Sequence, residues 1–222
     1  MPAKKSLTEQ LYPIPKDFGE SIKGFKDDAF NILLSYVWQG YEQLINDIRK
    51  INLDSDTQSL EDDITNNLSF KITELMPSAG SFNLRTWQKE YETRKEGASK
   101  TPEIDLAFVY KNNPRKMFCI EAKLLNTDKD KSKYISEFNQ NFLTGRYSPF
   151  AGEGAMLGYL LNGNPEVFFE NLRSKNFKLL DHPKFSNKPH KYSKHKRTKV
   201  KDPNYSKTFL CHHLILSFSI LR

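Results

Sequence analysis

The chain has 222 residues, of which 37% are hydrophobic and 13% aromatic, and its net charge at pH 7 is +7. This length suits one compact domain with a packed core, and the composition excludes a chain that is disordered throughout. No apolar run approaches membrane-spanning length, the N-terminus lacks the apolar region of a secretory signal, and two cysteines make no disulfide framework. We therefore expect a soluble, cytoplasmic protein with no membrane partner.

The first third of the chain predicts an irregular arm and two helices. Residues 1–18 contain three prolines and few periodic apolar positions. Over 26–52, apolar side chains recur every three or four residues, which predicts an amphipathic helix. A polar break then precedes a second helix over 60–76, with Ser59 or Thr57 as the expected N-cap.

The remainder alternates short apolar runs, bounded by turn residues, with segments of helical periodicity. The expected elements are strands over 82–91, 104–110 and 117–125, a helix over 131–143, a strand over 155–161, a helix over 166–178 and a strand over 209–221. This order predicts the α/β class: a mixed β-sheet core flanked by helices, to which the first helix is an addition. We divide the chain into an N-terminal arm and helix, 1–56, and a main domain, 57–222.

Two of the predicted strands carry charged residues inside apolar runs. Asp105 lies one residue into IDLAFVY, and Glu121 and Lys123 lie within MFCIEAKLL. A hairpin centred on Asn113 would pair residues whose numbers sum to 226 and set Asp105 opposite Glu121, on the face that Lys123 shares. Carboxylates so placed repel each other unless a cation such as Mg²⁺ or Mn²⁺ lies between them, and Lys123 can then hold a water or stabilise a phosphate. The alternative is a surface hairpin held by salt bridges.

Residues 102–123, PEIDLAFVYKNNPRKMFCIEAK, resemble the motif of the PD-(D/E)xK, restriction-endonuclease-like nucleases, with two residues inserted between Pro102 and Asp105. The resemblance implies a restriction-endonuclease-like fold in which Asp105 and Glu121 bind Mg²⁺ or Mn²⁺ and Lys123 assists the water that cleaves a phosphodiester. It further implies an endonuclease with DNA favoured over RNA, acting with a protein partner as an effector subunit of a bacterial restriction or anti-phage system. The alternative is a non-catalytic nucleic-acid-binding or assembly subunit of the same fold.

Members of this family often add a carboxylate from a helix that precedes the first catalytic strand. On a helical projection of 60–76, Glu61 falls within the apolar arc, whereas Asp62 and Asp63 fall outside it. The resemblance therefore predicts Glu61 as a third metal ligand beside Asp105. The alternative is a solvated Glu61 in the first turn, where a negative charge suits the helix dipole.

The positive charge is concentrated near the C-terminus. Residues 173–207 carry twelve Lys or Arg and two acidic residues, which is typical of a polyanion-binding surface and equally of a solvated, lysine-rich loop. Within this tract, 192–197 predicts a phosphate-contacting loop. Outside it, the aromatic residues of 142–150 fit either base stacking together with Arg146 or a core helix that leads into a loop, and the second explains most of them. The predicted nucleic-acid contacts are Lys194, His195, Lys196, Arg197 and Arg146. All five histidines follow residue 181 without the spacing of a structural zinc site, so we expect phosphate contact or packing from them.

Overall fold

The computed structural model describes residues 29–48, 56–90, 101–197, 200 and 205–219, and the predicted arm over 1–18 lies outside them. Its order of helices and strands confirms the α/β class. In chain order, the elements are α3 (Ala29–Asp47), α4 (Thr57–Leu75), β1 (Phe82–Lys89), β2 (Glu103–Tyr110), β3 (Met117–Leu124), α5 (Asp128–Glu137), the π-helical turn η1 (Phe138–Phe142), β4 (Glu153–Leu160), α6 (Pro165–Ser174), β5 (Leu180–Asp181), β6 (His190–Lys196) and β7 (Thr208–Ser217).

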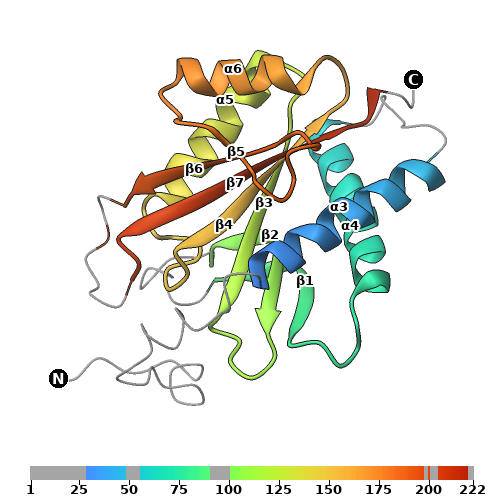
Figure 1. Cartoon of the computed structure of the whole chain (residues 1–222), viewed down its shortest axis with the longest axis vertical. Coiled ribbons are helices and arrows are strands. Elements are labelled where there is room, and N and C mark those ends of the chain that lie inside the picture. The colour runs from blue at the N-terminus through green and yellow to red at the C-terminus, as the bar shows by residue number, and fades with distance from the viewer. Residues whose placement is uncertain (1–28, 49–55, 91–100, 198–199, 201–204, 220–222) are drawn as a thin grey trace.

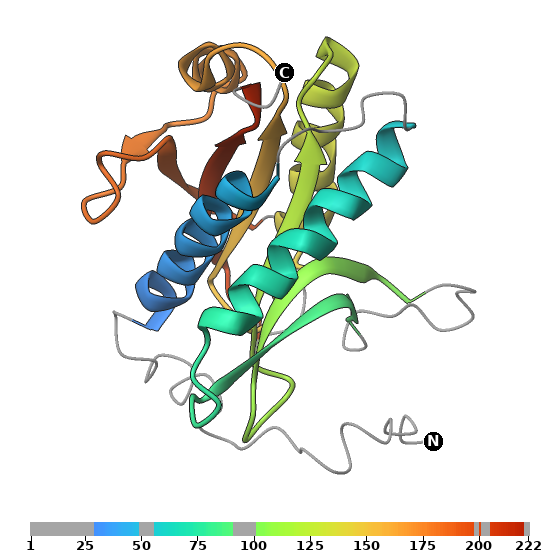
Figure 2. The same cartoon turned by 90° about the vertical axis from the view of Figure 1, so that its right-hand side faces the viewer.

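The strands form one mixed sheet of seven, in the order β1-β2-β3-β4-β7-β6-β5. Neighbours β3, β4 and β7 run parallel, and the remaining neighbours pair antiparallel. Helices α3 and α4 cover one face of the sheet, and α5 and α6 cover the other (Figures 1 and 2). The sheet is therefore the middle of three layers. Within the described ranges, none of the helices is long and apolar enough to cross a membrane.

The buried side chains form a core on each face of the sheet. Ile120 of β3 packs in the core beneath α3 and α4, together with Val37 of α3. Its neighbour Cys119 packs in the opposite core with Phe169 of α6. Successive side chains of a strand point to opposite faces, so a central strand buried on both sides must be apolar throughout its length. Charged residues in such a strand therefore need partners.

Helices α3 and α4 pack directly against each other. A β-carbon on Gly40 of α3 would lie 2.8 Å from Cγ1 of Ile72 in α4, so the close approach depends on glycine at this position. The two helices contribute to the same core, although the predicted division at residue 56 separates them. Helix α3 is thus part of the layer that covers the sheet.

Two local predictions are wrong. The N-cap of α4 is Asp56, not Ser59 or Thr57: the Asp56 side chain accepts hydrogen bonds from the backbone N–H groups of Gln58 and Ser59. The predicted loop over 192–197 is largely the strand β6, which pairs with β7 along its whole length.

Candidate active site

The pairing between β2 and β3 stops short of the charged residues. β2 remains paired with β1 as far as Glu103, but its pairing with β3 runs only from Val109↔Met117 to Leu106↔Ile120. The partners' numbers sum to 226, which confirms the predicted hairpin register. Beyond Leu106 the two strands separate, and the backbone N–H groups on this side of β3 need other acceptors. We call the place where the two strands separate, with Asp105 on β2 and Glu121 and Lys123 on β3, the fork.

Two carboxylates replace the missing backbone acceptors at the fork. Asp105 Oδ2 accepts from the backbone N–H of Ala122 at 2.7 Å, and Glu61 Oε2 accepts from the backbone N–H of Leu124 at 2.8 Å. Hydrogen bonds to ionised acceptors are stronger than those between neutral groups, so both carboxylates are held firmly. Glu61 of α4 faces the sheet with 4% of its surface exposed, as the helical projection predicted.

The amine of Lys123 lies among three carboxylates. Lys123 Nζ is 3.0 Å from Glu121 Oε1 and 3.1 Å from Glu61 Oε1. Asp105 Oδ2 lies 3.4 Å from the same amine, which also donates to the carbonyl of Ala122. The fold thus brings together all four residues predicted for the active site, with Asp105 and Glu121 on the same side of the sheet.

The charges at the fork do not balance. Three carboxylates face one ammonium group, so two negative charges are uncompensated when every group is ionised. Burial, and then the Asp105 carboxylate, raises the pKa of Glu121 to about 8. Burial also raises the pKa of Asp105 and of Glu61, although Lys123 opposes both shifts. Burial by itself would lower the pKa of Lys123, but the three carboxylates outweigh it and raise that pKa, so the amine stays charged.

One carboxylate oxygen at the fork has no hydrogen-bond partner. Among the buried side-chain nitrogen and oxygen atoms of the described residues, only Glu121 Oε2 and Ser148 Oγ lack one. An unpartnered, buried carboxylate oxygen is costly, and Mg²⁺ and Mn²⁺ prefer oxygen ligands of this kind. Glu121 and Asp105 could supply oxygen ligands of this kind, whereas Glu61, predicted as a third ligand, does not complete a group of three ligand oxygens within 4.8 Å of one another. Because the Lys123 amine contacts all three carboxylates, an ion could bind between them only if the amine moved aside.

Residues that the sequence analysis missed support the fork. The Thr65 hydroxyl donates to the carbonyl of Glu61 at 2.8 Å and lies 3.0 Å from the hydroxyl of Tyr159 in β4, which ties the N-terminal half of α4 to the sheet. Trp87, level with Asp105 in the register of β1 and β2, has a φ of 51°. Such left-handed backbone costs about 1–3 kcal/mol in a non-glycine residue and is concentrated at functional sites. These contacts depend on strand register and helix docking, for which the sequence carries no local signal.

Arg197 is not placed to contact a phosphate, so this prediction is wrong. Its side chain is buried, and its guanidinium group donates to the carbonyls of Phe142, Ser148 and Tyr147 at 2.8, 3.0 and 3.1 Å. It also lies over the ring of Phe209. Arg197 therefore fastens the segment between η1 and β4 to the end of β6. Its guanidinium N–H groups already donate to backbone carbonyls.

The other predicted nucleic-acid contacts differ in exposure. His195 is half-buried, hydrogen-bonded to the Ser193 hydroxyl at 2.7 Å and packed edge-on against Phe138. Lys194, Lys196 and Arg146 are exposed. These three cations are the predicted contacts whose side chains can reach a phosphate backbone.

Replacing Arg197 by Met is expected to destabilise the fold, because several buried carbonyls would lose their donor at once. We expect the free energy of unfolding, measured with urea, to fall by roughly 3 kcal/mol. The neighbouring Lys196→Met removes an equal charge from an exposed position and should change stability by less than about 0.5 kcal/mol. Equal effects of the two substitutions would contradict a structural role for Arg197.

Comparison of the chain with protein-family models, with curated proteins and with solved structures finds no match. The charged residues at the fork are therefore the features from which a function is inferred.

Proposed function

We propose that the chain is a metal-dependent nuclease of the PD-(D/E)xK kind, which hydrolyses phosphodiester bonds, of DNA in preference to RNA. One observation carries the proposal: the buried carboxylates of Glu61 and Glu121 and the half-buried carboxylate of Asp105 converge on a lysine amine where two strands separate, and one carboxylate oxygen has no partner. The mixed sheet with helices on both faces is compatible with a restriction-endonuclease-like core. We place such an enzyme in the cytoplasm, as an effector subunit that acts with a partner in a bacterial restriction or anti-phage system.

The chain's own residues would share the work as follows. Asp105 and Glu121 would hold Mg²⁺ or Mn²⁺, with Glu61 as a third carboxylate nearby. When bound, such an ion lowers the pKa of water and offsets charge on the phosphate. The Lys123 amine, displaced from the carboxylates, would donate a hydrogen bond to the attacking water or to a phosphate oxygen. The backbone N–H groups of Ala122 and Leu124 hold Asp105 and Glu61 in place.

The substrate backbone needs cations outside the fork. Lys194 and Lys196 on β6 and Arg146 are exposed, and Lys or Arg contacts to phosphates position a nucleic acid without reading its sequence. We therefore propose these three residues as backbone contacts. His195 and Arg197 do not belong to this set, because their side chains are engaged within the fold.

Cleavage assays test the proposal directly. We expect the full chain to nick or linearise supercoiled plasmid DNA with Mg²⁺ or Mn²⁺ and to leave it intact with EDTA, and to cleave a single-stranded RNA more slowly. Lys123→Ala should reduce the rate by roughly 100-fold or more, whereas Lys133→Ala, at an exposed position of α5, should not. A wild-type chain that binds nucleic acid tightly but cleaves neither substrate would instead be a non-catalytic binding subunit.

A further inference from the structure

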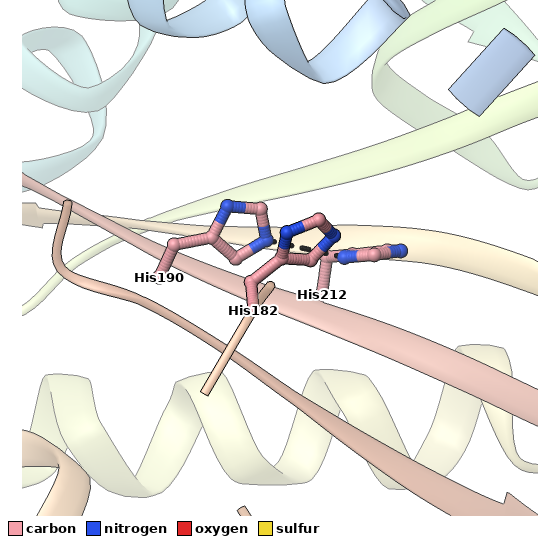
Figure 3. Close-up of side chains that lie close together, drawn as sticks. All are labelled: His182, His190 and His212. Carbon is pink, nitrogen blue, oxygen red and sulfur yellow. Dashed lines mark hydrogen bonds between the residues drawn. The ribbon is translucent and has the colours of Figure 1, made fainter. Parts of the chain in front are cut away.

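A second cluster of ligand-type side chains lies away from the fork. His182 follows β5, His190 begins β6 and His212 lies within β7. Figure 3 shows their three imidazole rings lying close together. Each ring offers one nitrogen, and these three atoms lie within 4.8 Å of one another; no other group of three His, Cys, Asp or Glu does so among the residues that the structure describes. All three histidines are buried. Strand β4 separates β7 from β3, so this cluster is distinct from the fork.

His212 has the surroundings of a metal ligand. Its Nε2 lies 2.6 Å from Glu153 Oε1, and a carboxylate behind the ring is the usual outer partner of a metal-bound histidine. Its Nδ1 lies 3.1 Å from His190 Nε2. Two nitrogens bound at 2.0–2.1 Å to one tetrahedral ion stand about 3.4 Å apart. This spacing therefore fits two ligands of one ion, and it also fits a hydrogen bond between the rings.

Burial disfavours protonation of His182 and of His190. Burial, and then His212 and Lys184, lowers the pKa of His182 to about 4. Burial and the neighbouring histidines lower the pKa of His190 well below its ordinary value. Neutral imidazoles keep lone pairs available at neutral pH, and imidazole nitrogen binds Zn²⁺ and related ions in preference to Mg²⁺.

We propose that His182, His190 and His212 bind one divalent transition-metal ion of the Zn²⁺ class. Because the ligands come from β6, β7 and the segment after β5, the ion fastens the β5–β6 edge of the sheet to β7. The proposal is independent of the nuclease assignment, since it uses no residue of the fork.

Ion binding has a structural consequence at Trp38. The Trp38 indole N–H donates to His190 Nδ1 at 3.3 Å. An ion on Nε2 leaves the ring proton on Nδ1, and two donors cannot face each other, so this contact must open. The ring of His182, stacked on His190 with centroids 4.5 Å apart, must also tilt toward the ion. Trp38 fluorescence therefore reports on binding.

The test is a titration of the full chain, freed of metal with EDTA, with Zn²⁺. Glu121→Gln removes a proposed metal ligand from the fork, so that an ion bound there does not confuse the titration. Trp87→Phe removes one of the two tryptophans and leaves Trp38 as the only source of tryptophan fluorescence. In this double variant we expect calorimetry to show one Zn²⁺ per chain. Trp38 emission should change with the same stoichiometry, Tm should rise with Zn²⁺ concentration, and Mg²⁺ should produce neither effect.

Ligand variants complete the test. His212→Gln should abolish the Zn²⁺ site, whereas His195→Gln, at a half-buried histidine of β6 outside the cluster, should keep it. If His212→Gln does not fold, the visible spectrum of Co²⁺ bound to the double variant decides, because a four-coordinate Co²⁺ ion held by three imidazole nitrogens and a water gives intense bands. Absence of Zn²⁺ binding, unchanged Trp38 emission on binding, or a site that survives His212→Gln would overturn the proposal. The cluster would then be a hydrogen-bond chain from Trp38 to Glu153.

Discussion

Replacing Lys123 by Met is expected to lower the free energy of unfolding by about 3–5 kcal/mol in the presence of EDTA. The substitution keeps an apolar chain of similar length but leaves the carboxylates of Glu61, Asp105 and Glu121 without their buried cation. Adding Mg²⁺ should restore most of the loss, because an ion at the fork would neutralise the same carboxylates. Urea unfolding with and without Mg²⁺ measures both quantities.

Lys133→Met provides the control for that experiment. Lys133 is exposed on α5, so its removal should change stability by less than about 0.5 kcal/mol and leave no Mg²⁺ dependence of its own. If Lys123→Met lost stability that Mg²⁺ did not restore, the carboxylates would be a structural ion-pair cluster with no affinity for a divalent ion.

The metal-free wild-type chain is expected to lose stability as the pH rises from about 4.5 to about 8, because burial and Asp105 raise the pKa of Glu121 from its ordinary 4.5 to about 8. Within this window the folded chain retains a proton that the unfolded chain has released, so stability falls as the pH increases. Glu121→Gln carries a neutral amide at every pH. It should remove most of this slope, make the metal-free chain more stable at pH 8, and abolish metal-dependent cleavage.

Denaturant unfolding of both chains in EDTA across this pH range measures the slope. Glu166→Gln serves as a control, since Glu166 is at the exposed start of α6 and its loss should leave the wild-type slope intact. A Glu121→Gln chain with the wild-type pH dependence would show that Glu121 ionises freely, and the charge imbalance at the fork would lose its importance.

Much of the fork could be predicted because its residues follow simple periodicities. Turn residues about Asn113 set the hairpin register, and the i, i+2 rule places Glu121 and Lys123 together. The helical projection placed Glu61 on the buried face of α4. Separation of β2 from β3, and the capping of freed N–H groups by carboxylates, could not be predicted, since they depend on how α4 docks against the sheet.

The C-terminal third was harder to predict because its buried residues are polar. The inward positions of β6 include His190 and Ser193, which are satisfied by hydrogen bonds to His212 and His213. A strand whose buried residues are polar lacks the apolar alternation that identifies strands, so the sequence of 192–197 predicts a loop where the structure has most of β6. The histidine cluster could not be predicted for a related reason: its members come from separate segments, and no local spacing joins them.

The central claim is that the fork binds a divalent metal ion, and anomalous X-ray scattering from crystals grown with Mn²⁺ tests it most directly. We expect an anomalous peak within about 2.0–2.3 Å of a Glu121 oxygen and of Asp105, with the Lys123 amine displaced from the carboxylates that it contacts in the metal-free fold. Crystals with no peak at the fork under saturating Mn²⁺, and with Lys123 still among Glu61, Asp105 and Glu121, would contradict the claim.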